Sequence, residues 1–149
     1  MKIMNHDLVV SESIDINRPV ADIWNTMTNP KIIKEYLFGT ETITNWEVGS
    51  GIVFQGEYGD NNEYYYRDKG VITENIKHKQ LSYTYWSGFS GLEDKPENYS
   101  LVTYTLTEKG PDCTNLRWTQ KGFANEDAYR HSSEGIHDFL KKIKDITER

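Results

Sequence analysis

The C-terminal stretch 125–149 has the clearest pattern of apolar and polar positions in the chain. Its apolar residues recur at steps of three and four: Ile136, Phe139, Leu140, Ile143 and Ile146. Such spacing draws one stripe along an α-helix, and the charged residues fall on the opposite face. Asn125 suits the N-cap of this helix, because its side chain can accept a backbone N–H from the first turn. The pattern predicts a long helix that buries Phe139, Leu140 and Ile143 against the remainder of the protein.

The first half of this predicted helix has a different stripe. Its positions are Tyr129, Ser132 and Gly135, which are small or polar apart from the tyrosine. A glycine inside a helix costs about 1 kcal/mol relative to alanine. Two interpretations remain open: Gly135 leaves room for a ligand beside the helix, or it allows a close packing contact.

The N-terminal third of the chain predicts one strand and two short helices. The expected order is a loose start at 1–7, a strand over 8–17, a helix from Val20 to Asn29-Pro30, and a helix over 31–36. Asn17 is expected to cap the first helix, and proline after Arg18 is compatible with its first turn. Two short helices cannot form a core by themselves, so they are expected to link across a sheet edge.

The middle of the chain alternates between apolar and polar residues, with turn residues at short intervals. The predicted strands cover 41–46, 52–58, 63–76, 81–86, 99–107 and 114–121, with a bend in the long strand near Gly70 and a long loop over 87–98. Consecutive strands joined by short turns favour an antiparallel meander. A sheet with one apolar face needs a cover, and the C-terminal helix is the element able to supply it. The sheet is therefore expected to curl around that helix and leave a cavity along the groove.

Composition limits the classes of partner. The chain has 149 residues, 36% hydrophobic and 27% charged, which fits one globular domain over 1–149. Its net charge is −6 without a basic run, which argues against nucleic acid as a partner. No stretch approaches the length of a membrane span, and Asp7 and Glu12 interrupt any signal-peptide core, so neither membrane insertion nor export is expected. The interpretation is a cytoplasmic protein.

Catalytic and metal-binding motifs are missing from the sequence. A single cysteine, Cys113, excludes an internal disulfide framework. His131 and His137 are six residues apart, so they fall on different faces of the helix and form a poor metal pair. The sequence therefore predicts no metal and no cofactor. Glu74, Arg117 and His131 are the candidates for an acid or base inside the cavity, should the protein be an enzyme.

Aromatic residues make up 13% of the chain and carry more information. Strand alternation assigns four groups of residues each to one face: Ile52 and Phe54; Leu81, Tyr83 and Tyr85; Val102, Tyr104 and Leu106; Leu116, Trp118 and Gln120. If these faces line the groove, its wall is apolar with several hydroxyl groups, which suits a flat, partly polar ligand. The alternative is plain core packing. Of Tyr64, Tyr65 and Tyr66, at most one or two can point inward.

Several short motifs resemble one protein family. They are Ile14 to Val20 with Ile23-Trp24, Trp46 to Gly51, Gly70 to Glu74, Leu81 to Tyr85, and Glu134-Gly135-Ile136. In order and spacing they resemble the SRPBCC superfamily, also called START-like or Bet v 1-like, and within it the domains similar to the activator of Hsp90 ATPase. The resemblance covers nearly the whole chain. Family members usually have Trp where this chain has Ile136.

The resemblance implies an α+β helix-grip fold: a curved antiparallel sheet of six to seven strands wrapped around a long C-terminal helix, with two short helices after the first strand. It also implies an apolar cavity for a hydrophobic small molecule, such as a lipid, a polyketide or a flavonoid-like aromatic. Combined with the strand alternation, this fold is expected to line the cavity with Phe54, Tyr66, Ile72, Tyr83, Tyr85, Tyr104, Trp118, Ser132, Gly135, Ile136 and Phe139.

Two other functions remain open at this point. Some members of the superfamily are cyclases or dehydratases, so an enzyme acting on a polyketide-like substrate is one alternative. A chaperone-associated, protein-binding role is a weaker one, because the eukaryotic namesake depends on an additional N-terminal domain that this sequence is not expected to contain. A protein partner or a homodimer is compatible with either function.

Overall fold

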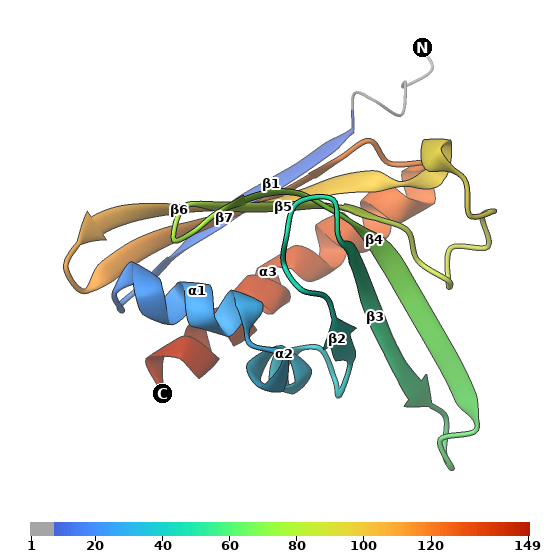
Figure 1. Cartoon of the computed structure of the whole chain (residues 1–149), viewed down its shortest axis with the longest axis horizontal. Helices are drawn as coiled ribbons and strands as arrows, with labels where there is room; N and C mark the ends of the chain where they lie inside the picture. The colour runs from blue at the N-terminus through green and yellow to red at the C-terminus, as the bar shows by residue number, and fades with distance from the viewer. Residues whose placement is uncertain (1–7) are drawn as a thin grey trace.

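The computed structural model describes residues 8–149, so the loose start expected at 1–7 lies outside the described residues. Within that range the elements are β1 (Val9–Ile16), α1 (Val20–Thr28), α2 (Pro30–Tyr36), β2 (Glu41–Ile43), β3 (Gly51–Tyr58), β4 (Tyr64–Ile76), β5 (Gln80–Tyr85), the 3-10 turn η2 (Pro96–Asn98), β6 (Ser100–Gly110), β7 (Cys113–Lys121) and α3 (Glu126–Glu148). Figure 1 shows the strands as one sheet with the helices on one side of it. The predicted α+β helix-grip architecture is confirmed.

The sheet is antiparallel, with the strand order β1-β7-β6-β5-β4-β3-β2. Strands β2 to β7 form the predicted meander, and β1 joins it by pairing with β7. The two edge strands are therefore β1 and β2, which follow one another among the strands of the chain. Because α1 and α2 connect them, the two short helices carry the chain from one edge of the sheet to the other (Figure 1).

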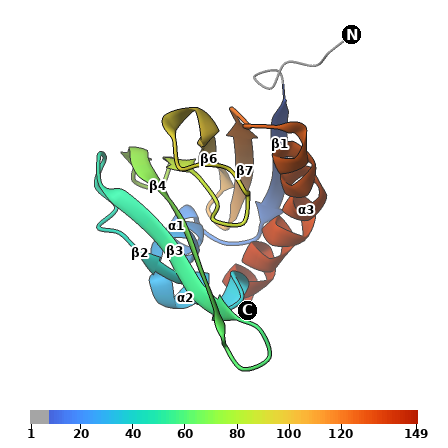
Figure 2. The ribbon, with the colours of Figure 1, turned by 90° about the vertical axis from the view of Figure 1, so that its right-hand side faces the viewer.

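Helix α3 lies across the hollow side of the curved sheet, with the β3–β4 hairpin on the other side of the hollow (Figure 2). Its N-terminus is capped as predicted, since the Asn125 side chain accepts the backbone N–H of Ala128 at 2.8 Å. Leu140 and Ile143 are fully buried in the core. Phe139 is only half-buried, which corrects the prediction for that residue: its ring packs beside Tyr36 and Trp118 but leaves part of its surface in a cavity.

Strand alternation is confirmed along the inner face of the sheet. Less than a tenth of the surface is exposed for Ile52, Phe54, Leu81, Tyr83, Val102, Tyr104, Leu106, Leu116, Trp118 and Gln120. The outer face carries mainly hydroxyl and charged side chains. A sheet with one apolar and one polar face needs a cover on the apolar side alone, and α1, α2 and α3 supply it.

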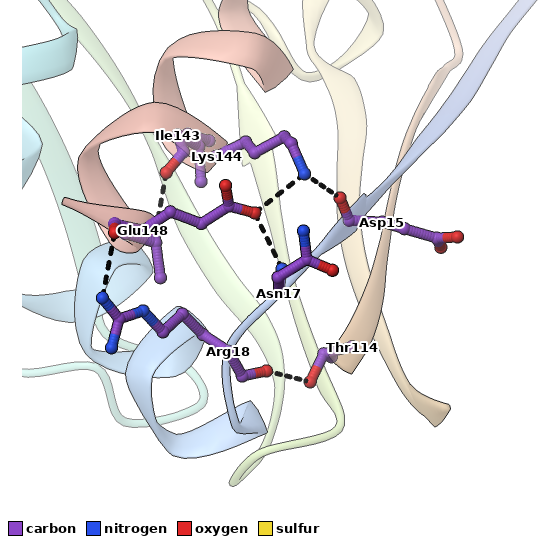
Figure 3. Close-up of polar contacts among 8 residues, drawn as sticks. Asp15, Asn17, Arg18, Thr114, Ile143, Lys144 and Glu148 are labelled. Carbon is purple, nitrogen blue, oxygen red and sulfur yellow. Dashed lines mark hydrogen bonds and ion pairs between the residues drawn. The ribbon is translucent and has the colours of Figure 1, made fainter. Parts of the chain in front are cut away.

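Polar contacts fasten the C-terminal end of α3 to the corner between β1 and α1 (Figure 3). The Arg18 guanidinium donates to the backbone carbonyl of Glu148 at 2.9 Å, and the backbone N–H of Asn17 donates to the Glu148 carboxylate at 2.8 Å. Lys144 donates to the backbone carbonyl of Asp15 at 2.6 Å and to the same carboxylate at 2.8 Å. Cations at a helix C-terminus also offset the helix dipole. We call these contacts the C-terminal clamp.

Two local predictions need correction. Asn17 does not cap α1, because the helix begins at Val20 with Pro19 as its N-cap and Asn17 lies two residues before that cap. The predicted strand 41–46 ends at Ile43, since the side chains of Thr44 and Asn45 accept backbone N–H groups two residues ahead and turn the chain. The bend expected near Gly70 stays a prediction; β4 changes partner close to it, pairing with β3 up to Val71 and with β5 from Ile72, and its register shift lies between Ile72 and Glu74. At Gly70 a Cβ would lie 1.6 Å from the carbonyl oxygen of Thr84, so glycine is required there for close approach to β5.

Candidate ligand-binding site

A cavity of about 870 Å³ lies between the sheet and the N-terminal half of α3. This volume falls within the usual range of small-molecule sites. Ten of the eleven residues predicted to line a cavity do so: Phe54, Tyr66, Tyr83, Tyr85, Tyr104, Trp118, Ser132, Gly135, Ile136 and Phe139. They come from β3 to β7 and α3, so the sheet supplies the floor and the helix supplies one wall.

Ile72 is the predicted residue that the cavity does not include. Its side chain is fully buried in the hydrophobic core. It shares the inner face of β4 with Tyr66, but it lies past Gly70, where the core closes over the strand. Alternation identified the face correctly, but it could not show how far along the strand the cavity extends.

Small side chains of α3 widen the cavity where the helix borders it. A Cβ placed on Gly135 would meet no atom within 4 Å, and Ser132 one turn earlier also lines the cavity. The close packing contact considered for Gly135 is therefore absent from the described part of the chain. Open space lies beside this residue.

The floor carries a pair of buried phenols. The hydroxyls of Tyr83 and Tyr104 are 3.4 Å apart and share a hydrogen bond. Burial raises the pKa of both tyrosines, so both stay protonated at neutral pH. Their single shared hydrogen bond uses one of the two phenolic hydrogens. One hydrogen is thus left to donate to a ligand oxygen, because it meets no acceptor among residues 8–149.

A buried amide stands beside the helix. The Gln120 side-chain NH2 donates to Ser100 Oγ at 2.7 Å, and Gln120 Oε1 accepts from Ser132 Oγ at 2.6 Å. All three residues line the cavity. An amide nitrogen has two hydrogens, and the second has no acceptor among the described residues. This chain of contacts ties β6, β7 and α3 together and offers a further donor to the cavity.

A carboxylate lies in the opposite wall. Asp68 Oδ2 accepts the Tyr85 hydroxyl at 2.7 Å, and Oδ1 accepts the backbone N–H of Gly88 at 3.0 Å. Both Asp68 and Tyr85 line the cavity. Burial, followed by the negative charge of Asp68, raises the pKa of Tyr85 far above its usual range, so its hydroxyl remains a donor.

Sequence reasoning missed Asp68, although a signal was available. Tyr66 points into the cavity, and the residue two further along the same strand must share its face. The loop over 86–99 was also missed as a wall of the cavity, where it contributes Trp86, Phe89 and Leu92. The position of a loop over a sheet depends on tertiary packing, and its residue pattern carries no sign of it.

The three acid or base candidates do not converge. Glu74 accepts a hydrogen bond from Gln80 at 2.8 Å and borders a separate groove of about 380 Å³. Arg117 points to the outer face, where it donates to Ser11 and Ser13. His131 lines the cavity but is exposed at its rim. Of the tyrosine triplet, only Tyr66 reaches the cavity, and its hydroxyl hydrogen-bonds to Thr40.

Residues 8–149 contain neither a metal-ligand cluster nor a membrane-spanning helix. No group of three or more His, Cys, Asp or Glu side chains is placed to hold a metal ion. No helix in this range has the length and apolar character needed to cross a bilayer.

Comparison of the whole chain with known proteins finds one family model and several similar structures. The family model described as "Activator of Hsp90 ATPase homolog 1-like protein" matches residues 17–148. The solution structure of ChR145 from Cytophaga hutchinsonii is 34% identical, with a TM-score of 0.79 over 99% of this chain and 97% of that chain. MLL2253 from Mesorhizobium loti is 25% identical, with a TM-score of 0.72 over 93% of this chain and 95% of that chain. CalU16 from Micromonospora echinospora shares the fold at 19% identity, with a TM-score of 0.71 over 93% and 75% of the two chains. The search of curated proteins found no match.

Proposed function

The chain belongs to the Activator of Hsp90 ATPase homolog 1-like family, and from its cavity we propose that it binds a hydrophobic or aromatic small molecule such as a polyketide, a flavonoid-like aromatic or a lipid. The observation that carries the proposal is the combination of volume and lining. A cavity of about 870 Å³ with aromatic walls borders a helix that has a glycine at the point of contact. Apolar burial supplies affinity in such a site, and a few hydroxyl groups orient the ligand.

The titratable groups favour binding over catalysis. A general base must be able to accept a proton near neutral pH. Burial raises the pKa of Tyr83, Tyr85 and Tyr104, so these phenols serve as neutral donors there. Glu74 and Arg117 do not line the cavity. This arrangement suits recognition of a ligand more than proton transfer to or from it.

Titration with Nile red, a neutral hydrophobic dye, tests the proposal. We expect its fluorescence to rise with saturable, one-to-one binding to the purified protein. Gly135→Leu should weaken binding by at least about tenfold, because the new side chain enters the open space beside the helix. Glu134→Leu is the matched control, since Glu134 is exposed and does not line the cavity. Equal affinity of the two variants, or no binding by the wild type, would refute cavity binding.

Native mass spectrometry provides an independent test. A ligand with nanomolar affinity survives purification and appears as a discrete added mass. We expect such a mass on the wild-type protein and less of it on Gly135→Leu. A mass that is present equally on both variants would indicate a site elsewhere on the protein.

A further inference from the structure

The charged groups of the cavity are unevenly distributed. Apart from tyrosines, its titratable lining residues are Asp68, Asp127 and His131, and neither Lys nor Arg lines it anywhere in residues 8–149. Asp127 lies at the rim with 86% of its side chain exposed and pairs with Arg130 at 3.3 Å. His131 is exposed as well. In the described part of the chain, Asp68 therefore supplies the negative charge set within the wall, and no fixed cation balances it from inside.

The backbone holds Asp68 in this position. In the β3–β4 ladder it stands directly opposite Phe54, whose side chain is buried in the same wall. A carboxylate removed from water is costly unless hydrogen bonds compensate it. The Tyr85 hydroxyl and the Gly88 N–H provide two such bonds, one to each oxygen. A carboxylate can accept about four, so about two acceptor positions remain for a ligand.

We propose that the bound ligand presents a hydrogen-bond donor, a hydroxyl or an ammonium group, to Asp68, and that the cavity rejects carboxylate and phosphate head groups. The inference rests on the proposed binding function and narrows its ligand class. An anionic head group would enter a site beside a fixed negative charge and find no lining cation to pair with. A donor group would instead occupy the acceptor positions that Tyr85 and Gly88 leave open.

Four naphthalenes that differ in one substituent test the proposal at pH 7. They are 2-naphthol, a neutral donor; 2-(aminomethyl)naphthalene, a cationic donor; 2-methoxynaphthalene, which lacks a donor; and 2-naphthoate, an anion. Each is measured by displacement of Nile red from the full chain. We expect the two donors to bind at least about tenfold more tightly than 2-naphthoate, and 2-methoxynaphthalene to fall between them. The ratio between the two donors shows whether the hydroxyl or the ammonium group is preferred.

Variants then assign the selectivity to one residue. Asp68→Asn should raise the affinity for 2-naphthoate and lower it for the ammonium compound, changing their ratio by at least about tenfold. Asp127→Asn, at the exposed rim, should change that ratio by less than about twofold, because water screens its charge. Tyr85→Phe removes a partner of Asp68 but keeps the charge, so rejection of 2-naphthoate should persist even if Asp68→Asn fails to fold.

The outcomes separate this inference from the function on which it rests. If Nile red and all four naphthalenes fail to bind, the proposed function is wrong and the inference goes with it. If Nile red binds but 2-naphthoate matches or exceeds 2-naphthol, cavity binding stands and the donor preference is refuted. An Asp127→Asn effect as large as that of Asp68→Asn would refute the assignment to Asp68. A shifted ratio at Asp68 alone supports it.

Discussion

The two halves of α3 face the same sheet with different side chains. From Ile136 to the C-terminus, bulky residues fill the stripe. Ile136 and Phe139 close the end of the cavity, Leu140 and Ile143 are fully buried, and the C-terminal clamp holds the end of the helix. From Glu126 to Gly135, the stripe contains small and polar residues, and the helix borders the cavity. The helical period is the same throughout. The size of the side chains at the stripe positions therefore decides where the protein is solid and where it is hollow.

The largest expected effect is at the solid half. Leu140→Ala should lower the free energy of unfolding by about 2–5 kcal/mol, because it leaves a void where the side chain is fully buried. Lys141→Ala, one residue later on the exposed face, should change it by less than about 0.5 kcal/mol. Urea unfolding followed by tryptophan fluorescence measures both. A loss below about 0.5 kcal/mol for Leu140→Ala would mean that this half is not tightly packed.

At the hollow half, alkaline pH provides the next test. Burial raises the pKa of Tyr83 and Tyr104, whereas an unfolded tyrosine has a pKa of about 10. Above that pH the unfolded state loses protons that the folded state keeps, so stability falls as pH rises. Each group accounts for up to about 1.4 kcal/mol per pH unit. Unfolding by guanidinium between pH 9 and 11 measures the slope.

A double variant isolates these two tyrosines. Tyr83→Phe with Tyr104→Phe should flatten the fall in stability above pH 10, because the two groups can no longer titrate in the unfolded state. Tyrosinate absorbance of the wild type should rise further at the unfolding transition than that of the double variant. An unchanged slope would show that both hydroxyls ionise freely in the folded protein and that the cavity floor is open to solvent.

Much of this contrast could be predicted from the sequence, because it depends on local order. The two-residue period of each strand assigns Tyr83, Tyr104 and Trp118 to its apolar face without any knowledge of strand order or sheet curvature. The Asn125 cap needs only the first turn of the helix. Long-range contacts lie beyond such reasoning. The bond from the backbone N–H of Asn17 to Glu148 joins residues 131 positions apart, and no local pattern indicates it.

The candidate site was predictable in its faces but not in its limits. Strand alternation and the helical stripe together identified ten lining residues, but they could not tell that Ile72 lies past the end of the cavity. Alternation placed Asp68 on the same face as Tyr66 but gave no reason to prefer it to other carboxylates, since its proposed role comes from its place in the cavity wall and its Tyr85 and Gly88 partners. A charged residue can be assigned to ligand recognition only after the residues that line the cavity have been identified.

The third prediction concerns a substitution that places a bulky side chain in the half of α3 that borders the cavity. Gly135→Leu should leave stability unchanged or raise it by up to about 1 kcal/mol, because leucine favours a helix and a Cβ at this position meets no neighbour. In a packed helix the same change would cost about 1–3 kcal/mol through overpacking. The two cases differ in sign. Thermal unfolding compared with Glu134→Leu measures the difference, and a loss above about 1 kcal/mol would show that the helix is tightly packed there.

The smallest expected effect concerns the C-terminal clamp, where the contacts are polar and partly exposed. The backbone N–H of Asn17, followed by Lys144, holds the pKa of Glu148 below its usual range. An acid with a lowered pKa stabilises the folded state above its unfolded pKa, about 4.3, and that stability is lost as the pH falls further. Glu148→Gln should cost at most about 1 kcal/mol at pH 7, since a quarter of the side chain is exposed to solvent and salt screens the pair. It should also flatten the fall in stability between about pH 5 and 3.

Asp138→Asn is the control, because Asp138 has no hydrogen-bond or ion-pair partner among the contacts of the described residues. It should leave the stability at pH 7 and the fall in stability between about pH 5 and 3 unchanged. If Glu148→Gln and Asp138→Asn behave alike at every pH, the Glu148 carboxylate adds nothing to the C-terminal clamp, which then depends on the contacts that Arg18 and Lys144 make with backbone carbonyls.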